Sequence, residues 1–234
     1  MTTTIAPVTT MINGKAGRQM PFAELFSEES LMLLDRLGLG RNDSQPTTLA
    51  LGMTSCTPGE GVTTVVTETA VAAAKHLQLR TVLVDCHFAR PTVHRTFGVG
   101  LCPGLRDALD HDMPLSDVVR PSGIESLSIV TAGTVQEDLD KAPLAPKMRH
   151  LISELRTEFD FLLFDLPTLN QGRPARVGAA LDGVVLIVEA ERVQWQVAQR
   201  ATTSLRSDGV SLLGAVLNKR RRHLPSWLGR AMQS

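Results

Sequence analysis

The amino-acid sequence predicts an α/β domain built on a mainly parallel β-sheet with helices on both faces. Two observations support this fold class. Nearly continuous apolar runs, such as residues 159–165 and 183–190, alternate with stretches of helical periodicity, and this alternation is typical of buried parallel strands. Residues 48–85 also read in order as a strand, a glycine-containing loop, a helix and a second strand, which together form one βαβ unit.

The composition favours one large domain in a reducing compartment. The 234 residues are 43% hydrophobic, which is enough for a substantial core, and the formal net charge of zero gives no general attraction to nucleic acid. Cys56, Cys86 and Cys102 are not spaced as a disulfide framework. Cys56, Cys86 and His87 lie at the strand ends but lack the spacing of a metal site, so we expect the two cysteines to be small buried residues. The chain shows neither the apolar core of a signal peptide nor a membrane-spanning apolar run, and we therefore expect a cytoplasmic protein.

Three regions are expected along the chain. Residues 1–20 are rich in threonine and are predicted to form a flexible N-terminal tail. Residues 21–218 are predicted to form the domain, which begins with an amphipathic helix over 21–38 that nearby glycines would end. Residues 219–234 are predicted to form a basic tail, because they contain five lysine and arginine residues and no acid.

The remaining elements follow from periodicity and from turn residues. Strands are expected at residues 49–53, 82–84, 126–133, 159–165, 183–190 and 210–218. Helices are expected at residues 62–77, 144–159 and 193–205, with short helical segments after Pro91 and over 104–109. Residues 136–143 are polar and are expected to be exposed.

The loop between the first central strand and its helix has the chemistry of a phosphate-binding loop. It reads TSCTPGEGVTT over residues 54–64. Gly59 and Gly61 allow backbone N–H groups to turn inward, and the N-terminus of the following helix adds its positive end. In a P-loop, the residue after the last glycine is a lysine that reaches the β- and γ-phosphates, whereas this chain has Val62 there.

Polar side chains follow three of the expected strands at the point where each strand ends. They are Asp85, Asp165 and Asn218. The carboxyl ends of parallel strands meet at one edge of a sheet, where ligands of such sheets bind, so we expect these side chains close to the loop. A helix cap or a surface acid at a strand end is the alternative for the two aspartates.

Several motifs in this order resemble the cytoplasmic domain of bacterial tyrosine kinases of the capsule and exopolysaccharide type, the CpsD/CapB-like family of P-loop ATPases. The segment TSCTPGEGVTT is similar to the family loop TSxxPGEGKST, LVDCHFARPTVHRTFG to LVDADxRxPxxHxxFG, and FDFLLFDLPT to YDxxxxDTPP. ALDGVVLIVEA and LLGAVLNK match the strands that follow in the family. The resemblance covers roughly residues 21–220 and implies a three-layer P-loop NTPase fold.

The resemblance implies a role for each matched position. Asp85 and Asp165 would be the catalytic acids, the first near the metal and the attacking group, the second ordering the water shell of the metal. Thr63 would hold Mg²⁺ with its hydroxyl, and Asn218 would recognise the adenine of ATP or ADP. The phosphates would be lined by Gly59, Glu60, Gly61, Val62 and Thr64.

The departures from the family pattern concern the catalytic chemistry. Val62 replaces the loop lysine, His87 replaces the second aspartate of the DAD motif, and Leu166 and Thr168 alter the TPP triplet. The sequence contains no tyrosine and so lacks the cluster that the family autophosphorylates. A lysine about 4 Å from a phosphate charge contributes on the order of 4 kcal/mol at an effective dielectric constant of 20, or roughly a thousandfold in binding or rate.

These departures predict a catalytically impaired protein in which ATP or ADP and Mg²⁺ bind weakly or not at all. Its role would be that of a regulator or scaffold in the synthesis or export of a capsule-type polysaccharide. The alternative is an active tyrosine kinase or ATPase in which Arg90 or Arg173 replaces the missing charge. A positioning ATPase related to the partition proteins is less favoured, because those proteins carry a second lysine at the place of Thr57.

The resemblance also implies partners and a location. The family suggests the cytoplasmic segments of a membrane polysaccharide co-polymerase as partner. Nucleic acid is not expected as a partner, because the rest of the chain offers no basic patch by sequence. The basic tail, with Trp227 and Leu228, would either lie on the anionic inner face of the membrane or remain solvated. Met32 and Asp35 occupy the arginine positions of the ring-assembly motif of the family, so the resemblance does not decide whether the chain forms a homo-oligomer.

Overall fold

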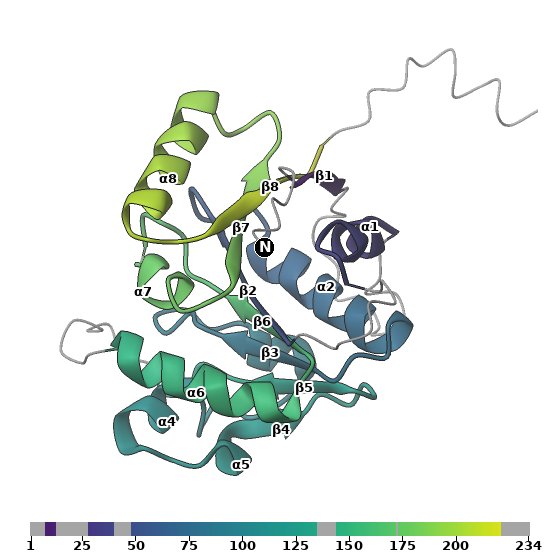
Figure 1. The fold of residues 1–234 in the computed structure, drawn as a ribbon, viewed down its shortest axis with the longest axis vertical. Helices are drawn as coiled ribbons and strands as arrows, with labels where there is room; N and C mark the ends of the chain where they lie inside the picture. Colours follow the sequence, from purple (N-terminus) through teal and green to yellow (C-terminus); the bar gives the residue numbers. More distant parts are fainter. Residues whose placement is uncertain (1–7, 13–27, 40–47, 135–143, 172, 221–234) are drawn as a thin grey trace, which may run out of the picture.

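The structure is a computed structural model that describes residues 8–12, 28–39, 48–134, 144–171 and 173–220. The described residues form one sheet of eight strands with helices on both faces, which gives three layers (Figure 1). The α/β fold class and the mainly parallel sheet predicted from the sequence are therefore confirmed.

The sheet is parallel at every pairing except the last. Its strands are β1 (Val8–Ile12), β2 (Leu49–Ser55), β3 (Thr81–Asp85), β4 (Val119–Pro121), β5 (Leu127–Val130), β6 (Phe161–Asp165), β7 (Gly183–Glu189) and β8 (Leu212–Asn218). They are ordered β1-β8-β7-β2-β6-β3-β5-β4, and only the short β4 runs antiparallel to its neighbour. The central strands are buried on both faces, which explains why their sequences are apolar at nearly every position.

The helices divide between the two faces of the sheet. They are α1 (Glu28–Arg36), α2 (Val62–His76), α3 (Val93–Phe97), α4 (Leu105–His111), α5 (Leu115–Val118), α6 (Leu144–Glu158), α7 (Ala175–Gly178) and α8 (Trp195–Ser207). The buried side chains of α1, α2 and α3 pack in one core cluster, and those of α4 to α8 pack in the other (Figure 1).

Alternate residues of each strand supply the two cores. In β6, Phe161 and Leu163 face the core under α2, whereas Leu162 and Phe164 face the core on the opposite side. All four are fully buried, and burial of such a side chain stabilises a fold by about 1.5–3 kcal/mol. This two-residue alternation fixes the register of β6, and with it the direction of Asp165 at the end of the strand.

Helix α2 follows directly from its sequence. It is rich in alanine, the residue with the highest helix propensity, and Lys75 and His76 place basic side chains at its negative C-terminal end. Its observed range agrees with the expected helix over residues 62–77 apart from the last residue. The other expected strands and helices are also present, with small shifts at their ends.

Five elements differ from the expectations. Residues 8–12 fall inside the predicted flexible tail, yet they form β1 and pair with β8, because the segment VTTMI is rich in β-branched residues that favour strands. The short elements β4, α5 and α7 were not expected. Helix α1 is described only from Glu28, so the N-terminal part of the predicted helix over 21–38 lies outside the described residues, as do residues 136–143.

The order of the strands gathers the polar strand ends at one edge. Asp85 and Asp165 are register partners on the neighbouring strands β3 and β6. Strand β2, which leads into the glycine loop, lies between β6 and β7, and β8 with Asn218 follows next to β7. Within the described part of the chain, no helix has the length and apolar character that crossing a bilayer requires.

A substitution at Gly52 in β2 tests how tightly the sheet is packed near the carboxyl ends of its strands. A Cβ at Gly52 would lie 2.6 Å from Leu166 Cδ1 and 2.8 Å from Leu181 Cδ1, and Leu166 directly follows Asp165. Overpacking of a core generally lowers stability by about 1–3 kcal/mol. We therefore expect Gly52→Ala to lower the free energy of unfolding by this amount in a denaturant titration, whereas Gly100→Ala, whose nearest neighbour would be 3.8 Å away, serves as the near-neutral control. Equal stability of the two variants would contradict the tight packing.

Candidate functional site

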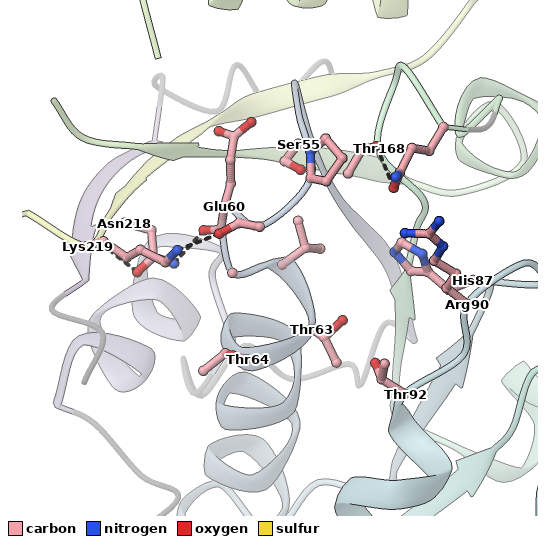
Figure 2. A pocket seen from close by; sticks show the side chains of 15 residues that line it. Ser55, Glu60, Thr63, Thr64, His87, Arg90, Thr92, Thr168, Asn218 and Lys219 are labelled. Atoms are coloured by element: carbon pink, nitrogen blue, oxygen red, sulfur yellow. Dashed lines mark hydrogen bonds between the residues drawn. The ribbon is translucent and has the colours of Figure 1, made fainter. Parts of the chain in front are cut away.

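A cavity of about 500 Å³ opens at the carboxyl edge of the sheet, over the glycine loop and the start of α2. Its walls come from the loop, from the segment after β3, from the segment after β6 and from the end of β8. Figure 2 shows Asn218 and Lys219 on one side of the loop, and His87, Arg90 and Thr92 on the other. Of the predicted strand-end residues, Asn218 lines this cavity, while Asp165 and Asp85 contact the lining residues Thr63 and His87.

The loop has the backbone shape that its glycines predict. Gly59 and Gly61 have φ values of 84° and 91°, in the left-handed region that other residues rarely adopt. Gly61 directly precedes α2, and a Cβ there would also collide with the amide nitrogen of Asn218. Glycine is therefore required at Gly61 both for its backbone angle and for the close approach of Asn218.

Val62, at the position of the P-loop lysine, faces the core. Its side chain is 6% exposed and belongs to the apolar cluster under α2, although its edge lines the cavity. A β-branched apolar side chain at the first residue of the helix cannot supply charge to a phosphate. The structure therefore gives position 62 a packing role.

Thr63 and Asp165 form the best-preserved part of the predicted metal site. Thr63 Oγ1 donates a hydrogen bond of 2.7 Å to Asp165 Oδ2. Asp165 is fully buried, and its other oxygen, Oδ1, has no hydrogen-bond partner among the described residues. Burial and the neighbouring charge of Asp85 raise the pKa of the Asp165 carboxyl well above its usual range. An orphaned buried oxygen beside a threonine hydroxyl fits a hydrated Mg²⁺, which takes oxygen ligands.

Asp85 is committed to the backbone of the next segment. Its carboxylate accepts hydrogen bonds from the backbone N–H groups of His87 at 2.9 Å, and of Thr92 and Val93 at 3.2 Å. It therefore caps α3 and shapes the turn before it, and its role near the metal and the attacking group stays a prediction. Burial raises the pKa of Asp85, while the three N–H donors oppose that rise.

His87 lies near the Asp165 oxygen that Thr63 does not contact. Its Nε2 is 3.8 Å from Asp165 Oδ1, and its side chain is 18% exposed. Burial lowers the pKa of His87, which favours the neutral imidazole at neutral pH. His87, at the position of the second aspartate of the DAD motif, therefore supplies neither a carboxylate nor a positive charge at neutral pH.

Glu60 lines the cavity, and its carboxylate is bound within the protein. The residue is fully buried, and its Oε1 accepts from the backbone N–H of Thr57 at 2.5 Å and from the Thr57 hydroxyl at 2.9 Å. Its Oε2 accepts from the backbone N–H of Glu189 at 3.0 Å. A buried carboxylate needs such donors, so Glu60 fastens the loop to the end of β7, and only its backbone can face phosphates.

Asn218 also holds the loop. The side chain is buried, its Nδ2 donates to the backbone carbonyl of Glu60 at 2.8 Å, and its Oδ1 accepts from the backbone N–H of Lys219 at 2.8 Å. Each end of the amide thus has one partner within the protein, and each can take a second. Asn218 lines the cavity, and its recognition of adenine stays a prediction.

Two cationic side chains that were not among the predicted site residues donate hydrogen bonds to the loop. Arg192 donates to the Pro58 carbonyl at 3.0 Å, and Lys219 Nζ donates to the Gly59 carbonyl. Both also pair with Glu189, at 2.7 Å and 3.3 Å respectively. The sequence assigns Lys219 to the basic tail. Its position directly after the strand-end Asn218 is the sequence feature that indicates a place near the site.

The two arginines proposed as replacement cations separate in space. Arg90 lines the cavity, on the wall that follows β3. Arg173 lines another cavity, between α7 and α8. Thr64 lines the loop cavity as predicted.

The cysteines near the strand ends are buried thiols. Burial raises the pKa of Cys56 to about 11 and that of Cys86 well above its ordinary value, so both are protonated at neutral pH. Among the described residues, no group of three or more histidine, cysteine or acidic side chains is placed to hold a metal ion. These positions behave as the small buried residues expected from the sequence.

Comparison with known proteins identifies relatives of the chain, although no protein-family model matches it. The putative tyrosine-protein kinase CapB of Staphylococcus aureus is 28% identical over 141 residues, which cover 60% of this chain and 62% of that protein. The tyrosine-protein kinase YwqD of Bacillus subtilis is 27% identical over 170 residues, 72% of this chain and 71% of that protein. The chain is a relative of bacterial tyrosine kinases. Its match spans less than two thirds of the length of CapB.

Solved structures agree on the fold. The kinase domain of the Escherichia coli tyrosine kinase ETK superposes with a TM-score of 0.80 at 19% identity, over 93% of this chain and 91% of that chain. The chimerical protein CapA2B2 gives 0.76 at 22% identity, over 92% and 95%. The septum site-determining protein MinD of Pyrococcus horikoshii, solved with Mg-ADP, gives 0.63 at 23% identity, over 79% and 77%. The three-layer P-loop NTPase fold is confirmed.

The raised pKa of Asp165 predicts a pH-dependent loss of stability that Asp165→Asn removes. As the pH rises above about 4, the unfolded chain ionises this group while the folded chain resists, so the folded state loses stability over that interval. We expect Asp165→Asn to gain stability relative to the natural chain as the pH rises, because the asparagine side chain has no proton to lose. Denaturant titrations from pH 4 to 8 measure the difference, which should vanish near pH 4.

Asp160→Asn is the control of opposite sign. The hydrogen bond from the Arg80 side chain lowers the pKa of Asp160, so this carboxylate adds stability that is lost as the pH falls. The Asp160 variant should therefore be slightly less stable than the natural chain at pH 7. A destabilised Asp165→Asn whose deficit does not change with pH would contradict the account of Asp165.

The buried carboxylate of Glu60 predicts a second stability effect. Glu60→Ala leaves the backbone N–H groups of Thr57 and Glu189 without their acceptor, and an unsatisfied buried donor costs about 1–3 kcal/mol. We expect a loss of about 2 kcal/mol or more in unfolding free energy, and faster hydrogen exchange at those two amides. Glu60→Gln keeps one acceptor oxygen and should lose roughly half as much. Unchanged exchange in Glu60→Ala would show that Glu60 does not fasten the loop.

Proposed function

We propose that this protein is a tyrosine-kinase-like regulator or scaffold in the synthesis or export of a capsule-type polysaccharide, with impaired phosphoryl transfer. The single observation that carries the proposal is the buried, neutral Val62 at the position of the loop lysine. The relatives are tyrosine-protein kinases, and the phosphate-binding fold of this chain is preserved around that substitution.

Two further contacts support impairment. The carboxylate of Asp85 is occupied by three backbone N–H groups, so it is held as a cap. His87, close to Asp165, is neutral at neutral pH because burial lowers its pKa. Phosphoryl transfer depends on positioning and on stabilisation of charge on the transferred group, and this part of the site offers little of either.

Binding of a nucleotide is compatible with the same geometry. The loop keeps the two glycines with positive φ that allow its backbone N–H groups to bind a phosphate, and such binding needs no lysine side chain. The Thr63 hydroxyl and the orphaned oxygen of Asp165 are the groups that would hold a hydrated Mg²⁺. When bound, Mg²⁺ would neutralise charge on the phosphate oxygens. The protein would then bind ATP or ADP weakly and use it as a regulatory ligand.

The partner and the location are part of the proposal. The family resemblance points to the cytoplasmic segments of a membrane polysaccharide co-polymerase, and to the inner face of the membrane as the place where they meet. A solved protein of this fold is the chimera CapA2B2, which supports the idea of a companion segment. The sequence has no tyrosine, so regulation by tyrosine phosphorylation of this chain is excluded from the proposal. A homo-oligomer is compatible with it.

A second candidate function is an active kinase or ATPase that uses another cation. Arg90 favours it, because this side chain lines the cavity on the wall opposite Asn218 (Figure 2). An arginine that reaches the transferred phosphoryl group from outside the loop can stabilise its charge. The two functions differ in turnover, which is measurable.

Calorimetric titration with MgATP and MgADP tests the proposed function. We expect weak binding to the natural chain and no hydrolysis above background. Val62→Lys should bind at least about tenfold more tightly, because it restores a charge worth up to about 4 kcal/mol near a phosphate. Thermal melting of both proteins serves as the control for folding, since Val62 is part of the core.

Several outcomes would contradict the proposal. Mg²⁺-dependent hydrolysis by the natural chain that disappears in Arg90→Ala would establish the active enzyme. Unchanged surface polysaccharide after deletion of the gene would remove the assignment to that pathway.

A further inference from the structure

We propose that Lys219, at the end of β8, supplies the positive charge for the diphosphate of a bound nucleotide, in place of the lysine that the loop lacks. This inference rests on the proposed function, in which the loop binds a nucleotide without efficient phosphoryl transfer. Lys219 is the residue after Asn218, and its side chain reaches back to the loop.

The cavity limits the choice of cation. Among the described residues that line it, the basic side chains are His87, Arg90 and Lys219. His87 is held neutral by burial and lies beside Asp165. Arg90 stands on the wall that follows β3, across the cavity from the loop (Figure 2). Lys219 is the member of this set that contacts the loop itself.

The ammonium group of Lys219 has a donor to spare. One donor binds the carbonyl of Gly59, and another faces Glu189 Oε2 at 3.3 Å. A lysine ammonium has three donors, and the third has no partner among the described residues. The side chain is 36% exposed and lines the cavity, so an oxygen of a bound phosphate can approach this donor.

The backbone of Lys219 is set to aim the side chain at the loop. Its φ is 56°, in the left-handed region that a lysine rarely adopts, and its N–H is fixed by the Asn218 side chain at 2.8 Å. Backbone strain of this kind persists where the surroundings impose it, and such residues cluster at functional sites. The Cε atom consequently lies 3.7 Å from where a Cβ of Gly61 would be, next to the phosphate-binding backbone.

Glu189 does not cancel this charge, because it has another partner. Arg192 Nε lies 2.7 Å from the same Oε2 that Lys219 meets at 3.3 Å. One carboxylate is therefore shared by two cations, and the tighter pair is with Arg192. The cluster of Glu189, Arg192 and Lys219 retains one positive charge for a ligand.

The test separates the charge of Lys219 from its hydrogen bond. Lys219→Gln can still donate to the Gly59 carbonyl but carries no charge, whereas Lys219→Arg keeps both. In calorimetric titrations with MgADP, we expect Lys219→Gln to bind about tenfold or more weakly than the natural chain, and Lys219→Arg within about threefold. The affinity of the natural chain should fall with added salt, and that dependence should flatten in Lys219→Gln.

Lys147 provides a matched control. Its ammonium also donates to a backbone carbonyl, that of Leu109, and pairs with a carboxylate, that of Asp112, on the face that carries α6. Lys147→Gln should bind MgADP as the natural chain does. Adding Val62→Lys to Lys219→Gln should restore most of the lost affinity, because either lysine supplies the charge.

Three outcomes would overturn the inference. Equal binding by Lys219→Gln and the natural chain would mean that Lys219 only holds the loop. Tighter binding by Lys219→Gln would mean that Lys219 blocks the site. Absence of MgADP binding by the natural chain would leave Lys219 no nucleotide to neutralise. Hydrolysis of MgATP is a separate readout, since turnover would overturn the impaired-kinase proposal whatever the effect of Lys219.

Discussion

The candidate site depends on how the carbonyl groups of the glycine loop are held. Three consecutive carbonyls, those of Pro58, Gly59 and Glu60, accept hydrogen bonds from Arg192, Lys219 and Asn218 respectively. Carbonyls that are held in this way fix the orientation of the neighbouring peptide groups, whose N–H groups the proposed function assigns to a phosphate. The phosphate-binding shape of the loop is therefore maintained by the protein, through donors that come from the ends of β7 and β8.

This support explains how the fold persists after the loss of a lysine. The loop is tied to β7 by the buried carboxylate of Glu60 and to β8 by Asn218, while Val62 joins the core under α2. None of these contacts needs a nucleotide. The lysine charge that phosphoryl transfer requires can therefore be lost while the cavity keeps its shape and the fold its stability. The proposed regulatory role requires this state.

The sequence was sufficient for the fold and for the place of the site, but not for the duties of single residues. Periodicity and apolar runs located the strands, and their ends located Asp165 and the loop. The pattern could not show that Glu60 and Asn218 bind the protein itself, because hydrogen bonds between segments over a hundred residues apart leave no local signal. β1 was missed because five residues of a threonine-rich segment gain their strand structure from pairing with β8.

The pairing of β1 with β8 also protects the edge of the sheet. β1 lies in register along β8, with Ile12 opposite Asn218, and so occupies backbone groups that would otherwise form an open edge of the sheet. Unpaired strand edges recruit other chains, and proteins protect them. The strand β1 thus protects the edge of the sheet, and its removal would expose β8, the strand that carries Asn218, to pairing with another chain.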